Sequence, residues 1–152
     1  MPGETMGAHA YEYFVPYEAD LNAALDRLRQ RQFEAGRYNP AMPFLTFPIE
    51  EGSPAPGPQH DSIQEAVEDA GEDGTRSILD ISLVDTRPDD GVAAPIPNAQ
   101  LQELFGTAQP TRAMIQENMD FFEDIERGQC VYIIVYRDGV PSEIFFGGYS
   151  YD

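Results

Sequence analysis

Residues 130–149, CVYIIVYRDGVPSEIFFGGY, decide the fold of this chain. Two runs of β-branched and aromatic residues, Cys130–Arg137 and Val140–Tyr149, flank the dipeptide Asp138-Gly139. This dipeptide favours a two-residue turn between antiparallel strands, so the sequence predicts a C-terminal β-hairpin. Such a turn fixes the register, and we expect these opposed pairs: Tyr136 with Pro141, Ile134 with Glu143, Tyr132 with Phe145, and Val131 with Phe146.

The predicted register gathers tyrosines on one face of the sheet. Side chains alternate along a strand, so Tyr132 and Tyr136 share a face with Phe145, and continued alternation adds two further tyrosines. An amino-terminal strand of matching parity would extend this face. Tyrosine offers large, stiff, amphipathic contact area and is enriched at protein interfaces. The candidate binding surface therefore consists of Tyr11, Tyr13, Tyr132, Tyr136, Phe145, Tyr149 and Tyr151.

Two structural alternatives to this binding surface are open. Helices could cover the tyrosine face and leave only the hydroxyl groups in water at its rim. This is the simpler interpretation, because strands favour aromatic residues whatever their role. A bulge at Gly147-Gly148 could also reverse the alternation beyond it.

Upstream of the hairpin, the sequence predicts further strands and helices. Period-two alternation predicts strands at residues 11–17 and 77–85, the first near a sheet edge because Pro16 has no N–H to donate. Residues 42–47 could add a short strand. Apolar stripes with capping residues predict helices at residues 20–35, 62–70, 98–105 and 111–127.

These elements predict one α+β domain over residues 1–152. We expect a mixed or antiparallel sheet that carries the C-terminal hairpin, with helices packed mainly on one face. The N-terminus (residues 1–8) and a proline-rich loop (about residues 48–60) are expected to be flexible.

The chain is strongly acidic, with 27 Asp and Glu residues against 9 Arg and a net charge of −18. Small soluble domains usually carry a charge of magnitude ~2 to 8. The negative potential should repel nucleic acid and anionic membranes, and it should attract basic proteins with an effect that salt screens. Solubility in a salty cytoplasm would explain the same charge.

Cysteine and arginine usage indicate the setting of the protein. The single Cys130 cannot form an internal disulfide, and residues 1–11 do not resemble a signal peptide, so we expect a cytoplasmic location. Arginine is the sole cationic residue besides histidine, which favours a GC-rich, bacterial genome.

Motifs for metal binding or catalysis are weak. Asp69, Asp73 and Asp80 fall at ligand positions of a calcium-binding loop, but Gly71 occupies another ligand position, so this metal candidate is poor. His60 is not in a metal-ligand spacing, and Cys130 lies on an apolar strand. We therefore expect no cofactor and favour a non-enzymatic role.

Charge and the candidate tyrosine surface together favour a small acidic protein-binding module, such as an immunity or inhibitor protein that neutralises a basic partner. One alternative is a small enzyme or ligand-sensing domain with a site near the proline-rich loop that uses His60. Another is a structural protein that self-associates through the edge of the hairpin.

Overall fold

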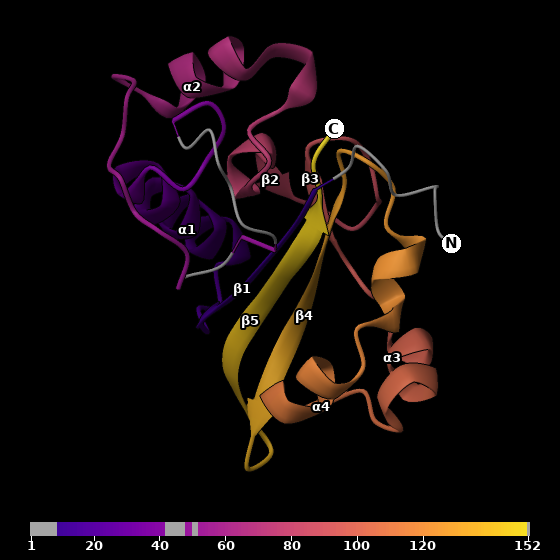
Figure 1. Cartoon of the computed structure of the whole chain (residues 1–152). Coiled ribbons are helices and arrows are strands. Elements are labelled where there is room, and N and C mark those ends of the chain that lie inside the picture. Colours follow the sequence, from indigo (N-terminus) through magenta and orange to yellow (C-terminus); the bar gives the residue numbers. More distant parts are fainter. Residues whose placement is uncertain (1–8, 42–47, 50–51, 152) are drawn as a thin grey trace.

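The computed structural model describes residues 9–41, 48–49 and 52–151. Five strands form one mixed sheet in the order β1-β5-β4-β3-β2 (Figure 1). The strands are β1 (Ala10–Pro16), β2 (Leu83–Val84), β3 (Val92–Pro95), β4 (Cys130–Arg137) and β5 (Val140–Tyr149). β1, β5 and β4 pair antiparallel, whereas β4, β3 and β2 pair parallel. The predicted α+β class, mixed sheet and C-terminal hairpin are confirmed.

The β4–β5 hairpin lies at the centre of the sheet. Asp138 and Gly139 have φ angles of 53° and 80°, as the tight turn requires. β5 also pairs with β1, and β4 with β3, so both hairpin strands have neighbours on both sides. β1 takes the edge position, as Pro16 predicts. Part of its outer edge is covered, because the Glu12 N–H donates to the Ile49 carbonyl over 2.9 Å.

The described residues contain four α-helices: α1 (Leu21–Ala35), α2 (Ile63–Ala70), α3 (Asn98–Phe105) and α4 (Arg112–Glu117). The side chain of Asp20 caps α1, and that of Ser62 caps α2 by accepting a hydrogen bond from the Glu65 N–H. The helices predicted at residues 20–35, 62–70 and 98–105 are therefore confirmed. α1 and α2 belong to one face, while α3 and α4 cover part of the other (Figure 1). α1 and α2 share one face, as expected, whereas α3 and α4 lie on the other face.

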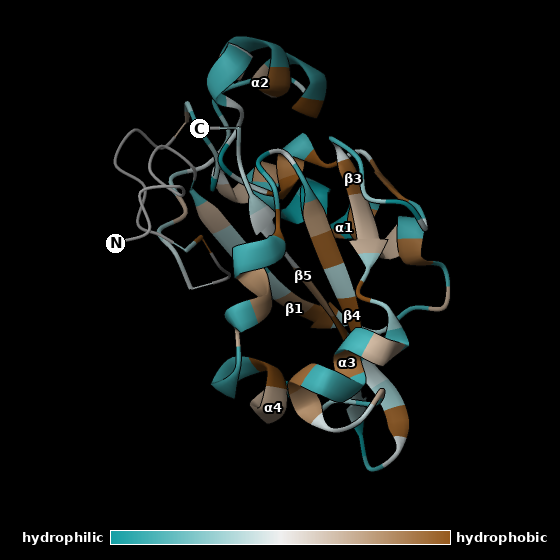
Figure 2. Ribbon diagram, turned by 90° about the vertical axis from the view of Figure 1, so that its right-hand side faces the viewer, coloured by the Kyte–Doolittle hydropathy of each residue, from teal (hydrophilic) through white to brown (hydrophobic). Residues whose placement is uncertain are grey.

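The sheet separates two hydrophobic cores. The first core, under α1 and α2, includes Tyr11, Tyr13, Leu25, Leu28, Ile144 and Phe146. The second, under α3 and α4, includes Leu101, Ile115, Phe121, Ile133, Val135 and Phe145. Figure 2 shows the matching pattern, with hydrophobic stretches on the strands and hydrophilic residues over most of α2. Burying each large apolar side chain stabilises the fold by about 1.5–3 kcal/mol.

A β-bulge changes the register of the hairpin. Tyr136 lies opposite Pro141 as predicted, but the register shifts next to it, and Ser142 is the extra residue. Ile134 therefore pairs with Ile144, Tyr132 with Phe146 and Val131 with Gly147, so these predicted pairs are wrong. The Ser142 carbonyl instead accepts a hydrogen bond from the Tyr17 N–H (3.1 Å).

Two predicted elements are wrong because side chains hydrogen-bond to the local backbone. Within the predicted strand 77–85, only Leu83–Val84 (β2) pair in the sheet, and a 3-10 turn forms at Ile78–Asp80. The Ser77 hydroxyl caps that turn by accepting from the Leu79 N–H. The predicted helix 111–127 ends at Glu117, where Asn118 has an extended backbone and its side chain accepts from the Asp120 N–H. A separate 3-10 turn follows at Asp120–Asp124.

Three expectations lie wholly or partly outside the described residues. These are the flexible N-terminus at residues 1–8, the short strand at residues 42–47, and residues 50–51 of the proline-rich loop. The described residues 52–60 contain no helix or strand. β3, which the sequence did not predict, contributes only four residues to the sheet.

Gly148 tests the packing at the centre of the sheet. A Cβ at this position would contact the Gln129 carbonyl and lie 2.7 Å from the Tyr11 hydroxyl oxygen. We expect Gly148→Ala to lower the free energy of unfolding by about 1–3 kcal/mol, since overpacking forces the neighbours apart. Urea unfolding measures the effect. Val140→Ala, at an exposed position of the same strand, should change stability by less than about 0.5 kcal/mol. Equal stability of the two variants would contradict the packing described.

Candidate functional site

The amino-terminal tyrosines of the candidate surface are buried. Tyr11 and Tyr13 share a sheet face with Tyr132 and Tyr136, which is the parity that the sequence predicts. However, α1 packs on this face, and Tyr11 and Tyr13 are 0% and 1% exposed. Tyr132 and Tyr136 stay half-buried. Tyr11 and Tyr13 thus belong to the core, and the expectation that they form an accessible binding surface is wrong.

Two further members of the predicted surface lie on the opposite face. Phe145 is fully buried in the second core, and the ring of Tyr149 packs edge-to-face against Phe122, with 5.7 Å between centroids. The bulge at Ser142 explains why these residues lie on the other face than predicted, because one extra residue reverses the facing of every later residue of β5. The seven residues therefore do not form one continuous surface.

Tyr149 and Tyr151 remain accessible at the end of β5 away from the hairpin turn (Figure 1). Tyr151 is 37% exposed. Partial burial and then the charges of Asp90, Asp80 and Asp89 raise the pKa of Tyr151. Partial burial and then the charge of Glu123 raise the pKa of Tyr149. Negative charges nearby make a phenol harder to ionise, so aromatic surface and negative potential coincide here.

We call this region the acidic tyrosine surface, and define it as Tyr149, Tyr151, Asp89, Asp90 and Glu123. Except for half-buried Tyr149, these residues are exposed. Each comes from one of three segments: the loop before β3, the 3-10 turn after α4, and the end of β5 with the residues that follow it.

Backbone hydrogen bonds through Gly128 join two of these segments, the loop before β3 and the end of β5. The Gly91 N–H donates to the Gly128 carbonyl (2.9 Å), and the Gly128 N–H donates to the Tyr149 carbonyl (3.0 Å). The ring of Tyr151 lies against Gly128, where a Cβ would be 2.8 Å from the Tyr151 Cδ1 atom. Buried Ser150 anchors the same segment by donating its N–H to the His9 carbonyl (3.0 Å). The acidic tyrosine surface is therefore preformed.

A buried polar group lies beneath the acidic tyrosine surface. One Asp80 carboxylate oxygen accepts a hydrogen bond from the Thr75 N–H (2.8 Å). Burial raises the pKa of Asp80, and the bond from Thr75 opposes part of this rise. Burial, followed by the charges of Cys130 and Asp80, raises the pKa of Tyr11 well above its ordinary value. Burial also raises the pKa of the Cys130 thiol to about 12, so Cys130 is not a reactive nucleophile.

The three carboxylates of the weak calcium candidate lie apart in the structure. Asp69 bonds to His60, Asp80 bonds to Thr75, and Asp73 is exposed in a 3-10 turn. In the described ranges, no three His, Cys, Asp or Glu side chains are grouped so that they could hold a metal ion. The fold thus does not bring Asp69, Asp73 and Asp80 together as one ligand set.

His60 belongs to a hydrogen-bonded chain of three side chains. Its Nδ1 lies 2.8 Å from the Tyr38 hydroxyl, and its Nε2 lies 2.9 Å from an Asp69 carboxylate oxygen. A neutral ring with the proton on Nε2 satisfies both contacts, since Tyr38 then donates to Nδ1. The His60 side chain is only 12% exposed and Tyr38 is fully buried. The chain ties the proline-rich loop to α2, which is a structural role.

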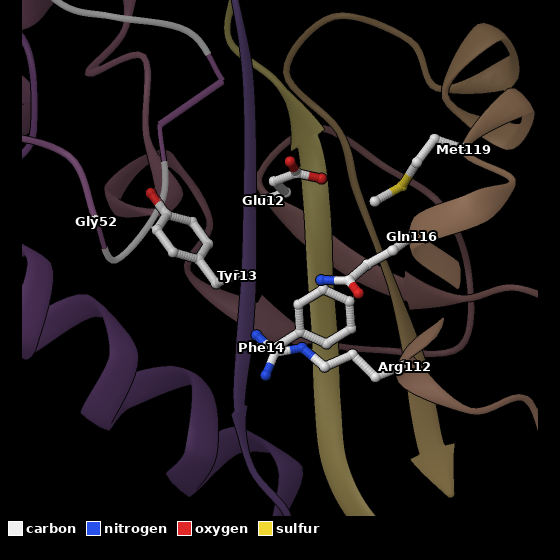
Figure 3. A pocket seen from close by; sticks show the side chains of 7 residues that line it. All are labelled: Glu12, Tyr13, Phe14, Gly52, Arg112, Gln116 and Met119. Atoms are coloured by element: carbon white, nitrogen blue, oxygen red, sulfur yellow. The ribbon is translucent and has the colours of Figure 1, made fainter. Parts of the chain in front are cut away.

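A cavity of about 230 Å³ lies between β1 and α4 (Figure 3). Figure 3 shows the Arg112 guanidinium beside the ring of Phe14, with Gln116, Met119 and Glu12 around the opening. The Arg112 Cζ atom is 4.4 Å from the centroid of the Phe14 ring, a cation–π contact. The sequence pattern gave no sign of this cavity.

Comparison with known proteins found no family model that matches the chain, and no curated protein and no solved structure that is similar to it. Its function is therefore inferred from its own surface.

Asp80 should make the stability of the protein depend on pH. Its folded pKa is raised above the ordinary value of 3.8, so the charged form is disfavoured in the fold. This penalty is absent below the unfolded pKa, grows as pH rises through the folded pKa, and persists at neutral pH. We expect the free energy of unfolding of Asp80→Asn, relative to that of the wild type, to be higher at pH 7 than at pH 3. Urea unfolding at the two pH values measures this difference. A difference that is independent of pH would contradict the raised pKa.

Proposed function

We propose that this chain is a small protein-binding module that docks a basic partner on the acidic tyrosine surface. One observation carries the proposal: Tyr149 and Tyr151 are the accessible members of the tyrosine set that lie among carboxylates close enough to raise their pKa values. A net charge of −18 attracts a cationic protein from a distance. Preformed aromatic surface then supplies contact area with little loss of side-chain entropy.

Several weak interactions must act together on this surface. A Lys or Arg over the ring of Tyr151 would contribute about 0.5–1 kcal/mol, and each exposed ion pair with Asp89 or Asp90 about 0.2–1 kcal/mol. Charge therefore acts mainly on the rate of association, and salt should weaken it. We infer a partner that presents several cations beside an apolar patch.

An immunity or inhibitor protein that neutralises a basic toxin or enzyme is the specific form of this function that the charge favours. We place it in a bacterial cytoplasm, in keeping with the single buried Cys130 and the use of arginine as cation. We expect no nucleic-acid partner, because the charge repels phosphate. Across the described ranges, every helix is too short or too polar to cross a bilayer.

The two other functions have less support. His60 would serve an enzyme or ligand sensor, but its ring nitrogens are engaged with Tyr38 and Asp69. His60 also lines none of four well-defined cavities among the described residues. Self-association through the hairpin would need an open strand edge. β1 pairs along β5, β3 pairs with Cys130–Tyr132 of β4, and further along β4 the Tyr136 N–H donates to the Pro110 carbonyl.

The proposal is tested by capturing partners from the native cell at low ionic strength and measuring the affinity of any specific partner for matched variants. Asp89→Asn/Asp90→Asn with Tyr151→Ala should weaken binding by about tenfold or more, as a loss of ~1.4 kcal/mol or more would. Rising salt should weaken binding to the wild type.

Two exposed carboxylates on α2 provide the control. Glu65→Gln/Glu68→Gln changes the net charge as much as Asp89→Asn/Asp90→Asn does, but away from the acidic tyrosine surface. Binding should stay within about twofold for this variant, since only long-range attraction is reduced. If Asp89→Asn/Asp90→Asn and Glu65→Gln/Glu68→Gln weaken binding equally, a localised surface is excluded. Recovery of no specific partner would count against the whole proposal.

A further inference from the structure

Arg112 makes contacts unlike those of three other arginines. The side chains that donate hydrogen bonds to protein oxygens include Arg27, Arg29 and Arg37. The Arg112 guanidinium instead stacks on Phe14, and its Nη1 atom lies 3.7 Å from a carboxylate oxygen of Glu143. That distance is too long for a hydrogen bond. Within residues 9–41, 48–49 and 52–151, the N–H groups of Arg112 find no acceptor at hydrogen-bond distance.

Arg112 is stacked on Phe14 and ion-paired with Glu143 but donates no hydrogen bond, so its N–H groups can hydrogen-bond an anion that competes with Glu143. The Phe14 ring holds the plane of the guanidinium, so its N–H groups need little reorganisation when a ligand arrives. Gln116 lies one turn further along α4 and lines the same cavity (Figure 3). Its amide group likewise has no hydrogen-bond partner in the described part of the chain. Two side chains that can donate hydrogen bonds to a carboxylate thus line one cavity.

The other walls of the cavity limit the ligand. Phe14 and Met119 supply apolar surface, and Glu12 lies across the opening. At about 230 Å³ the cavity is smaller than typical sites for drug-sized ligands. The net charge of −18 opposes anions, and it opposes multiply charged anions most strongly.

We propose that this cavity binds a small monocarboxylate with an apolar body. The guanidinium of Arg112 holds the carboxylate, the Gln116 amide donates to it, and the apolar body packs between Phe14 and Met119. This inference does not use the acidic tyrosine surface, so it stands or falls independently of the proposed function.

The test is an NMR titration of the protein with sodium 4-methylpentanoate at matched ionic strength. We expect saturable shifts of backbone amides in β1 and α4. The neutral isostere 4-methylpentanamide should bind about tenfold more weakly, since it loses the charge-assisted hydrogen bonds. Arg112→Gln should weaken binding of the carboxylate about tenfold or more, and Arg112→Lys should restore only part of the affinity because it lacks the planar fork.

Arg87→Gln is the matched control, because Arg87 is exposed, lines none of the four cavities, and gives the same change in net charge. It should leave the affinity unchanged. An unchanged amide spectrum outside the cavity shows that each variant is folded. The proposal is overturned if no shifts saturate, if the neutral isostere binds as tightly, if Arg87→Gln has the effect of Arg112→Gln, or if inorganic phosphate binds more tightly than the carboxylate.

Discussion

Alternation of side chains along the central hairpin is the constraint on which the rest of this structure depends. Successive residues of β4 and β5 point to opposite faces, so one pair of strands supplies apolar side chains to both cores. Phe145 and Phe146 are neighbours in sequence, yet each is fully buried in a different core. Helices must therefore cover both faces of the hairpin. Small residues allow this close packing, as at Gly148, where the Tyr11 hydroxyl leaves no space for a Cβ.

One extra residue in the hairpin determines where the aromatic residues lie. Without the bulge at Ser142, Phe145 would share a face with Tyr132, and a larger part of the tyrosine set would be together. With it, Tyr13 pairs with Phe146 above α1, and Phe145 makes an edge-to-face contact with Phe121 at 5.8 Å in the second core. Such contacts contribute about 0.5–1.5 kcal/mol beyond the burial of area. Aromatic residues that resembled a binding surface are mainly core residues.

The acidic charge stays at the surface, and packing decides where it is concentrated. Carboxylates are costly to bury, as the raised pKa of Asp80 illustrates, and most of the others in the described ranges are exposed. Asp89, Glu123 and Tyr151 are far apart in sequence. Backbone hydrogen bonds through Gly128 join the segments of Asp89 and Tyr151 at the end of β5, and the charge of Glu123 acts on neighbouring Tyr149. The cavity at Arg112 is a local exception to the acidic surface, held by a contact between β1 and α4.

The sequence by itself determined the elements that depend on local interactions. The Asp138-Gly139 turn, the caps Asp20 and Ser62, and the edge position of β1 are all effects of neighbouring residues on backbone conformation. Local pattern failed where a single side chain diverted the backbone, as Asn118 does at the end of α4. The overall α+β class follows from the order of these elements.

Only the tertiary structure decided which surfaces are open. The carbonyl of the bulge residue Ser142 accepts a hydrogen bond from the N–H of Tyr17, which directly follows β1 and lies far from Ser142 in the sequence. The contact of Arg112 with Phe14 joins residues about a hundred positions apart. The carboxylates around Tyr149 and Tyr151 lie a few tens of positions before these tyrosines. Long-range contacts of this kind depend on how whole elements pack, and no periodicity in the chain encodes them.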